Sequence, residues 1–330
     1  MTVLRVGTRG SALALAQTRQ VADSLAKASG LEIELVTITT HGDTATEPVS
    51  RLGGTGAFTG ALRDALLNDE IDLAVHSLKD LPTALHPDIV LAAVPRRADA
   101  RDVLCARDDL TLDTLPAGAK VGTGSPRRIA QLLAARPDVE VVDIRGNIDT
   151  RLGRVFATDD QPIDDDRRLD AILLAAAGLG RLGRADAATQ YLELTDWPTA
   201  PGQGALALET RRDKDNSPDG RAIAKALTSI NHVTTRASVV AERGVLAGLE
   251  AGCAAPLGAT ALVEDGLLFV TATVYSLDGT RKLTSSHAAS LEGNGQSALL
   301  EAAEDASQRV VEELLAAGAA QLAPLGGASR

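Results

Sequence analysis

Residues 121–135, VGTGSPRRIAQLLAA, contain the pattern on which the fold depends. A short strand ends at Gly122, small polar residues follow, and an amphipathic helix begins at Pro126. Ser125 is a good helix cap, and Pro126 is a favourable first helical residue. The stretch therefore predicts a strand, a tight turn and a helix in direct succession.

Strands and helices alternate in the same way on both sides of this stretch. Strands are predicted at 4–7, 32–39, 71–75, 90–94, 120–122, 139–143 and 171–175, and helices at 11–28, 59–67, 126–135 and 148–155. This alternation is typical of mostly parallel sheets with helices on both faces. After about residue 220 the pattern changes to a helix at 236–249, strands at 259–263, 267–276 and 282–288, and a helix at 297–315. Asp-Gly pairs between those strands indicate hairpins, so we expect an α/β chain with a small C-terminal α+β domain.

Length and composition fit a globular protein of two or three domains. The chain has 330 residues, 45% of them hydrophobic and 23% charged, and a domain holds roughly 100–200 residues. No apolar run approaches the roughly 18 residues of a membrane helix, and the first residues lack the pattern of a signal peptide. We therefore expect a cytoplasmic protein with no membrane partner.

The net charge and the cysteines exclude further classes. A net charge of −11 argues against a nucleic-acid partner, because neutralising phosphates requires a basic face. The two cysteines, Cys105 and Cys253, have no CxxC pattern and no paired histidines, which excludes a disulfide framework and a metal site of the zinc type. Cys105 lies in an apolar run and is expected to be a buried core residue.

Arginine supplies 27 of the 33 basic residues, and 19 of these arginines lie in the first 200 residues. Its planar fork binds carboxylates in a bidentate way that lysine cannot. A GC-rich genome would by itself explain an excess of arginine spread over the whole chain. The positions of the arginines therefore decide whether they have a binding role. Predicted strand ends carry small polar and basic residues at 8–11, 76–80, 123–128 and 145–151. Because ligands of open α/β sheets bind beyond the carboxyl ends of the strands, we expect these segments to face one crevice.

Arg127 and Arg128 conflict with the helix in which they lie. They occupy its first turn, where the helix dipole is positive and each cation costs about 0.3–1 kcal/mol. An anion bound against the amides and both guanidinium groups would resolve this conflict. The alternative is that both side chains extend into water.

Asp80 and Cys253 are candidates for chemistry, each with a structural alternative. Asp80 follows an apolar strand and precedes Pro82. It either caps a turn or, among cations, stays ionised and stabilises positive charge that develops in a reaction. Cys253 lies among small residues in a loop at 250–258, where it is either structural or a modified or reactive thiol.

Residues 178–183, GLGRLG, match the GxGxxG pattern of dinucleotide-binding proteins. Such a site also needs a following helix, a second parallel strand and an acidic residue about 20 positions on. The Pro-rich segment 196–204 interrupts that unit. We therefore expect neither a nicotinamide nor a flavin site.

Eight motifs along nearly the whole chain resemble, in order, those of the hydroxymethylbilane synthase family, also called porphobilinogen deaminases. They are VGTRGSALALAQ (6–17), GGTGAFTGALRDALL (53–67), DLAVHSLKDLPT (72–83), VGTGSPRRIAQL (121–132), IRGNIDTRL (144–152), LAAAGLGRLG (174–183), APGQGALALE (200–209) and AGCAAPLGA (251–259). Residues 178–183 then look like part of a family motif that contains Arg181.

The resemblance implies a transferase of tetrapyrrole (haem) biosynthesis. Such an enzyme joins four porphobilinogen molecules into the linear tetrapyrrole hydroxymethylbilane and releases ammonia at each step. A dipyrromethane cofactor primes the chain and would be attached to Cys253 by a thioether. Asp80 matches the catalytic carboxylate, which would hydrogen-bond pyrrole N–H groups, assist departure of the amino group and stabilise the azafulvenium cation.

The resemblance also implies binding residues for the acidic side chains of the pyrroles. The positions that match cofactor-binding residues are Arg9, Ser11, Lys79, Asp80, Thr123, Ser125, Arg127, Arg128, Arg145 and Gly146. Phe58, Arg151, Arg181 and Gln203 match substrate-binding residues. Thr55 departs from the family, which usually has a lysine there.

The fold implied by the resemblance has two lobes like those of periplasmic binding proteins. Domain 1 would span 1–96 with a return segment near 200–220, domain 2 would span 97–199, and a cofactor-carrying domain would span 221–330. The acidic loop 158–168 is longer than usual in the family and has no assigned role. We expect a monomer.

An anion receptor or the sensor half of a regulator would also suit a two-lobed fold with arginines at its strand ends. A secreted receptor begins with a signal peptide, and a regulator carries a helix-turn-helix. Neither pattern is visible. We therefore expect the enzyme, with porphobilinogen as its small-molecule partner.

Overall fold

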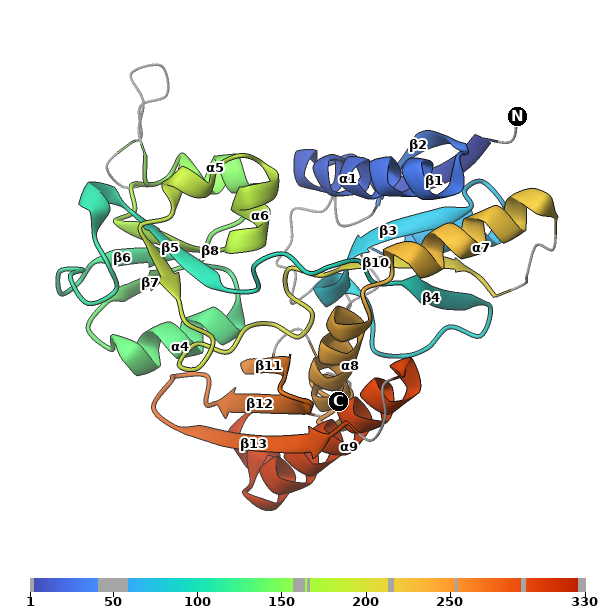
Figure 1. The fold of residues 1–330 in the computed structure, drawn as a ribbon. Helices are drawn as coiled ribbons and strands as arrows, with labels where there is room; N and C mark the ends of the chain where they lie inside the picture. The colour runs from blue at the N-terminus through green and yellow to red at the C-terminus, as the bar shows by residue number, and fades with distance from the viewer. Residues whose placement is uncertain are drawn as a thin grey trace.

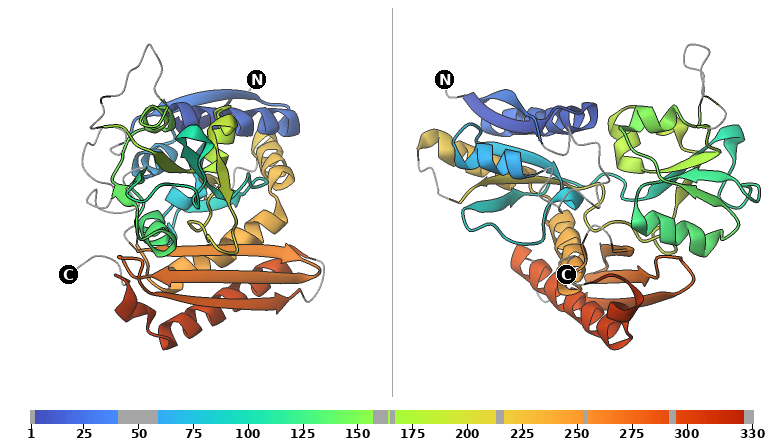
Figure 2. Two further views of the ribbon diagram at one scale, coloured as in Figure 1. Left: turned by 90° about the vertical axis from the view of Figure 1, so that its left-hand side faces the viewer. Right: turned by 180° about the vertical axis from the view of Figure 1, so that it is seen from behind.

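The structure is a computed structural model that describes residues 3–40, 59–156, 164, 167–212, 217–252, 255–291 and 295–325. Phe58, Cys253 and Thr55, together with most of the acidic loop 158–168, lie outside the described residues. The chain forms two lobes side by side, with a third unit against both (Figures 1 and 2).

The first lobe is built on a five-stranded sheet. Its order is β2 (Glu32–Ile38), β1 (Val3–Arg9), β3 (Leu73–Ser77), β10 (Leu206–Arg211) and β4 (Ile89–Ala93). β1 pairs in parallel with both of its neighbours, whereas β10 is antiparallel to β3 and β4. Helices α1 (Ala12–Ser29) and α7 (Pro218–Ile230) share one core cluster with the sheet, and α3 (Gly60–Leu67) belongs to another.

The second lobe repeats this plan. Its sheet has the order β7 (Glu140–Val142), β6 (Lys120–Gly122), β8 (Ala171–Ala175), β5 (Asp102–Ala106) and β9 (Gln190–Leu192). β6 is parallel to both neighbours, and β5 is antiparallel to β8 and β9. The helices of this lobe are α4 (Pro126–Ala135), α5 (Ile148–Leu152) and α6 (Ala176–Arg181), with single 3-10 turns η4 (Arg107–Asp109) and η5 (Ala185–Ala187).

Each sheet therefore contains four parallel strands and one antiparallel strand in the fourth position. The chain enters the second lobe through β5 and returns to the first through β10, so two crossovers, residues 94–101 and 193–205, join the lobes. They meet closely, because a Cβ on Gly204 (φ +82°) would lie 2.8 Å from the carbonyl oxygen of Ala98.

The third unit is a three-stranded antiparallel sheet with helices. It consists of α8 (Val233–Gly248), β11 (Leu257–Glu264), β12 (Leu267–Tyr275), β13 (Lys282–Ser290), α9 (Gln296–Ala316) and α10 (Ala319–Leu322). Alanines, valines and leucines of α8, α9 and the sheet form its core. The β12–β13 turn packs closely on α4, since a Cβ on Gly279 (φ +71°) would lie 2.5 Å from the carbonyl oxygen of Ala130.

The predicted fold class is confirmed: two α/β lobes with mostly parallel sheets and a small antiparallel domain. Strands β5, β9 and β10 were not among the predicted elements. All five residues of β5 are buried, so it lacks the polar–apolar alternation that marks a half-buried strand. Helix α7, mostly within 221–330, packs against α1 of the first lobe. Within the described residues no helix is long and apolar enough to cross a membrane.

Candidate functional site

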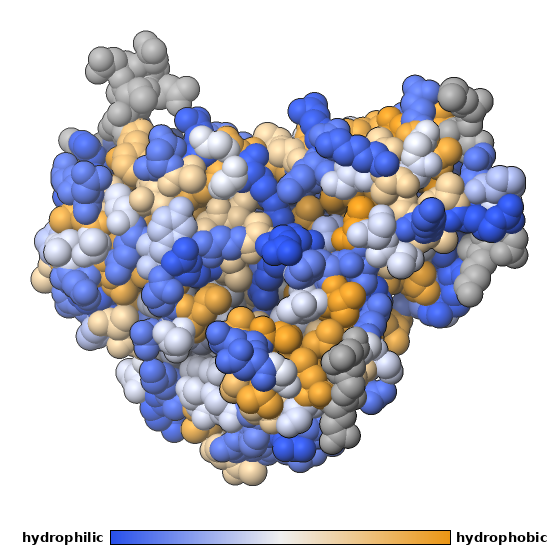
Figure 3. Space-filling view, in the orientation of Figure 1, coloured by the Kyte–Doolittle hydropathy of each residue, from blue (hydrophilic) through white to orange (hydrophobic). Residues whose placement is uncertain are grey.

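The four predicted strand-end segments meet around one cavity of about 530 Å³ between the lobes. The first lobe contributes Arg9 and Ser11 after β1, and Ser77 and Lys79 at the end of β3. The second lobe contributes the basic residues Arg128, Arg145, Arg151 and Arg181. In the space-filling view, hydrophilic residues gather where the two lobes meet (Figure 3). We call this the first cavity.

The lining of the first cavity is strongly cationic. Among the described residues it includes six cationic side chains and one carboxylate, Asp149, which already pairs with Arg184 at 3.0 Å. Burial lowers the pKa of Arg151 and Arg181, but guanidinium groups remain protonated in proteins. Ser11 also caps the N-terminus of α1, whose dipole is positive at that end. The cavity is therefore suited to a ligand with several negative groups.

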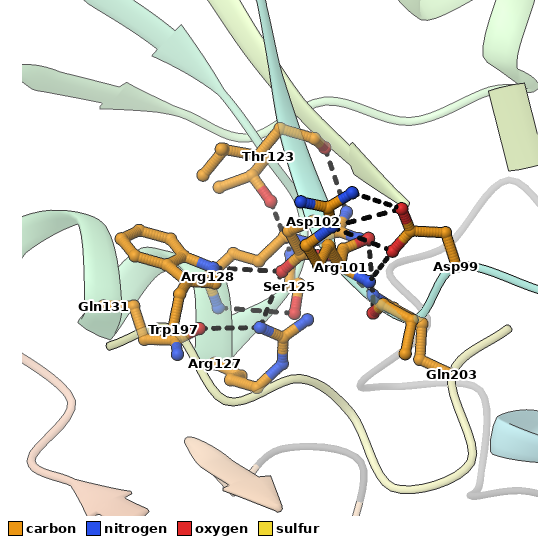
Figure 4. Close-up of polar contacts among 12 residues, drawn as sticks. Asp99, Arg101, Asp102, Thr123, Ser125, Arg127, Arg128, Gln131, Trp197 and Gln203 are labelled. Carbon is orange, nitrogen blue, oxygen red and sulfur yellow. Dashed lines mark hydrogen bonds and ion pairs between the residues drawn. The ribbon is translucent and has the colours of Figure 1, made fainter. Parts of the chain in front are cut away.

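Arg128, which lines the first cavity, and the adjacent Arg127 share one buried carboxylate, that of Asp102 (Figure 4). Arg127 donates to Oδ2 of Asp102 at 2.8 Å, and Arg128 donates to Oδ1 at 2.7 Å. Burial alone would raise the pKa of Asp102, but the two guanidinium groups hold it well below its usual range. Asp102 is therefore ionised, and the cluster of three charges has a net charge of +1.

The structure adds to the sequence-based interpretation of the Arg127–Arg128 pair a counter-ion that lies within the chain. The two side chains do not extend into water, since they are 4% and 6% exposed. The anion that offsets their charge at the start of α4 is Asp102 of the chain itself. The pair is thus held in place before any ligand binds.

Asp102 and Trp197 are the residues of this cluster that the sequence did not reveal. Nε1 of Trp197 donates to Oδ2 of Asp102 at 3.1 Å, and Nε2 of Gln203 donates to Oδ1 at 2.8 Å. Both donors come from the second crossover, while Asp102 directly follows the first. An acidic residue at the start of the apolar run 103–106 was the available signal, because a buried carboxylate needs cationic partners.

A second cavity of about 570 Å³ lies where both lobes meet the third domain. Its lining includes Lys79 from the first lobe, Ser125 and Arg127 from α4, and residues 250–252 after α8. Cys253 follows directly in the sequence. Lys79 lines both cavities, whereas Arg128 lines the first and Arg127 the second. Because both arginines pair with Asp102, its carboxylate connects the walls of the two cavities.

Asp80 lies in η3 (Leu78–Asp80), the single turn that follows β3. It is partly buried and is not among the lining residues of either cavity, whereas the adjacent Lys79 lines both. Burial lowers the pKa of Lys79 to about 8, with Asp80 acting to raise it and Arg128 and Arg127 acting to lower it. The charges of Asp80 and the arginine pair therefore act on the same ammonium group.

The remaining predicted residues have varied positions. Thr123 is buried, and its Oγ1 accepts from the amide of Ser125 at 3.3 Å. Ser125 caps α4 by accepting from the amide of Arg128. Gln203 is also buried and outside both linings, but it holds Asp102. Gly146 lines the first cavity with φ +106°, and a Cβ there would lie 3.0 Å from Cγ2 of Thr150.

Cys105 is buried in the core of the second lobe, as predicted. Burial raises the pKa of its thiol to about 12. Since the thiolate is the reactive form, Cys105 is unreactive at neutral pH.

Models of two protein domains match the chain. Residues 4–218 match porphobilinogen deaminase, dipyromethane cofactor binding domain, and residues 237–316 match porphobilinogen deaminase, C-terminal domain. The chain belongs to the porphobilinogen deaminase family. The predicted family, the predicted transferase and the predicted dipyrromethane cofactor are thereby confirmed.

Curated members of the family are closely similar over most of the chain. A porphobilinogen deaminase from Leifsonia xyli is 63% identical over 325 residues, which cover 98% of this chain and 95% of that one. Another, from Micrococcus luteus, is 51% identical over 308 residues, or 86% of this chain and 81% of that one. Among solved structures, a periplasmic substrate-binding protein of an ABC transporter from Coxiella burnetii covers 68% of this chain and 92% of its own, with 16% identity and a TM-score of 0.40.

The residues around the two cavities fit the acidic dipyrromethane of this family. The Nε atoms of Arg127, Arg128 and Arg181 are buried and have no hydrogen-bond partner among the described residues. An unpaired buried donor costs about 1–3 kcal/mol. Each pyrrole ring carries two carboxylates, which would supply acceptors for such donors.

Replacing Asp102 by Asn should destabilise the protein strongly. The change leaves Arg127 and Arg128 buried without their counter-ion, and breaking a buried ion pair costs about 3–5 kcal/mol. Asp99→Asn is the matched control, because Asp99 pairs with Arg101 near the surface, where a pair contributes about 0–1 kcal/mol. Urea denaturation measures both free energies of unfolding. Equal losses in the two variants would contradict this account of the cluster.

Proposed function

We propose that this chain polymerises porphobilinogen in the first cavity, with Asp80 as the catalytic carboxylate and Cys253 as the attachment point of the dipyrromethane. The product would be hydroxymethylbilane, built from four porphobilinogen molecules in tetrapyrrole biosynthesis. The convergence of six cationic side chains from both lobes on one cavity, next to the Asp80 turn, carries this proposal.

Recognition depends on the acidic side chains of the pyrroles. Porphobilinogen carries an acetate and a propionate, and arginine binds carboxylates with two parallel hydrogen bonds. Arg9, Arg145, Arg151 and Arg181 line the first cavity and would bind the incoming substrate and the growing chain, with Ser11 and Gly146 beside them. Phe58 and Gln203 complete the proposed substrate contacts, and Phe58 lies outside the described residues.

The cofactor would be held near the second cavity. Residues 250–252 and Ala255, which flank Cys253 in the sequence, line this cavity together with Arg127 and Ser125. Lys79, Arg127 and Arg128 would bind its carboxylates, with Thr123 supporting the turn that contains Ser125. When bound, the dipyrromethane supplies the free pyrrole carbon to which the first substrate is joined.

Asp80 would act on the substrate as the amino group leaves. Its carboxylate accepts a hydrogen bond from the pyrrole N–H, and its negative charge stabilises the positive charge that develops on the ring and methylene carbon. Each cycle breaks one C–N bond and forms one C–C bond. The proton lost from the attacked pyrrole carbon leaves with ammonia as ammonium, so each cycle balances. Release of the product would then break the C–C bond to the cofactor and add water, which supplies the terminal hydroxyl and returns a proton to the cofactor's pyrrole carbon.

We further propose that the enzyme is a cytoplasmic monomer. A reducing compartment keeps the Cys253 thiol free until the cofactor is attached. Both lobes and the third domain of one chain supply the residues that line the cavities. Sedimentation equilibrium tests the oligomeric state directly.

The intact mass of the purified chain should exceed the sequence mass by one dipyrromethane. This adduct should be absent in Cys253→Ser and present in Cys105→Ser, because the buried thiol of Cys105 is unreactive. Electrospray mass spectrometry of the three proteins measures the difference. An active wild-type enzyme of unmodified mass would contradict the proposed cofactor attachment.

Asp80→Asn should abolish turnover while the protein stays folded and keeps its cofactor. The amide has nearly the same shape but lacks the negative charge that stabilises the developing cation. Formation of porphyrin after oxidation of the released product reports turnover, and circular dichroism reports folding. Rates near those of the wild type would remove Asp80 from the mechanism.

The second-order rate constant kcat/KM should fall as the pH rises through about 8. Burial lowers the pKa of Lys79 to about 8, so its ammonium group is charged below that pH and neutral above it. Loss of this charge weakens binding of the carboxylates. In Lys79→Arg the charge persists, and the pH dependence should be flatter above pH 8. Identical profiles for the two enzymes would show that Lys79 does not titrate there.

A further inference from the structure

Arg243, on the buried side of α8, contacts the turn that contains Asp80. Its guanidinium donates to the carbonyl oxygens of Leu81 at 2.9 Å, Pro82 at 2.6 Å and Leu78 at 3.3 Å. Leu78 is the first residue of η3, and Leu81 and Pro82 directly follow this turn, so the three carbonyls flank Asp80 in the sequence. We propose that Arg243 is a positioning residue, which fixes the Asp80 carboxylate relative to the cavities by holding the backbone of this turn.

The geometry is specific to arginine. Three carbonyl oxygens of one turn are bound by two nitrogens of a single planar group, and a lysine ammonium cannot match this fork. Burial lowers the pKa of Arg243, because removing a cation from water is costly. Hydrogen bonds to the turn offset that cost only while the turn keeps its present shape.

The neighbouring residue fixes the helix itself. Glu242 is fully buried and accepts two hydrogen bonds from Arg97, at 2.6 and 2.9 Å, and one from the amide of Gly202 at 2.7 Å. These partners belong to the two crossovers between the lobes. Glu242 therefore anchors helix α8 to both crossovers at the position next to Arg243.

The C-terminal end of the same helix leads to the cofactor loop. α8 ends at Gly248, residues 250–252 line the second cavity, and Cys253 follows. One rigid helix thus connects the turn of the proposed catalytic carboxylate to the segment before the proposed attachment point. Arg243 would set the distance between Asp80 and the pyrrole chain. A misplacement of about 1 Å in an active site can cost about 100-fold in rate.

Arg236 provides a matched control on the same helix. It is also partly buried, burial also lowers its pKa, and its guanidinium also donates to backbone carbonyls of the first lobe, at 3.1 Å to Leu91 and 3.4 Å to Ala92. Those carbonyls belong to β4 and not to the Asp80 turn. Replacing either arginine therefore removes a similar anchor, but only Arg243 touches η3.

The test compares Arg243→Gln, Arg243→Lys and Arg236→Gln as holoenzymes, with the adduct measured by mass and the folded fraction by thermal melting. We expect kcat of Arg243→Gln to fall by about tenfold, since positioning effects have this size or more, while KM and melting temperature match those of Arg236→Gln. Arg243→Lys, which keeps the charge and one donor group, should recover part of kcat. The Lys variant also provides a folded protein if the Gln variant does not fold.

Two results would overturn the inference. One is equal kcat in Arg243→Gln and Arg236→Gln. The other is a loss in Arg243→Gln that only follows its folded fraction or its adduct content. The inference rests on the proposed function, but different experimental results would refute each of them. An active Asp80→Asn enzyme or an active enzyme without the adduct refutes the function, whereas equal kcat in the two arginine variants refutes only the role of Arg243.

Discussion

The carboxylate of Asp102 joins parts of the chain that are distant in sequence. Its Oδ1 accepts from Arg128 and Gln203, and its Oδ2 accepts from Arg127 and Trp197. A charge in an apolar interior is stable only when it is paired and its oxygens are hydrogen-bonded. The four donors must therefore all reach Asp102. This requirement fixes the positions of the start of α4 and the second crossover relative to the first residue of β5. The basic walls of both cavities depend on that arrangement, because Arg128 lines the first cavity and Arg127 the second.

An acidic protein can bind a polyanion because the local arrangement of charge matters more than the total. The chain has a net charge of −11, yet the described lining of the first cavity contains six cationic groups and one carboxylate. Exposed charges on the far surface are screened over about 10 Å at ordinary ionic strength. Partly buried guanidinium groups close to the ligand are screened much less. The strand ends concentrate these groups because parallel strands from both lobes finish at the same crevice.

The third domain completes the site without contributing to either sheet. Its helix α8 holds the crossovers through Glu242 and the Asp80 turn through Arg243, and it ends beside the second cavity. The turn between β12 and β13 packs on α4 through Gly279. Both lobes are thus tied to the domain that contains Cys253. In the proposed mechanism, this arrangement would keep a pyrrole chain attached at Cys253 within reach of the Asp80 carboxylate.

The sequence by itself determined the local elements and the family. The span of α4 and the strands at 120–122 and 171–175 were predicted at the residues where they occur, because caps, turn residues and hydrophobic periodicity act over a few neighbouring positions. The eight motifs identified the family and all six cationic residues in the described lining of the first cavity. Only the tertiary structure showed that β5 and β10 are the antiparallel strands of their sheets, and that one carboxylate, Asp102, pairs with both Arg127 and Arg128. These features depend on contacts such as Arg128–Asp102 and Arg243–Leu81, which join residues 26 and 162 positions apart. No local sequence pattern specifies such pairs. A charged side chain needs a partner only when folding removes it from water, and the partner comes from a distant part of the chain.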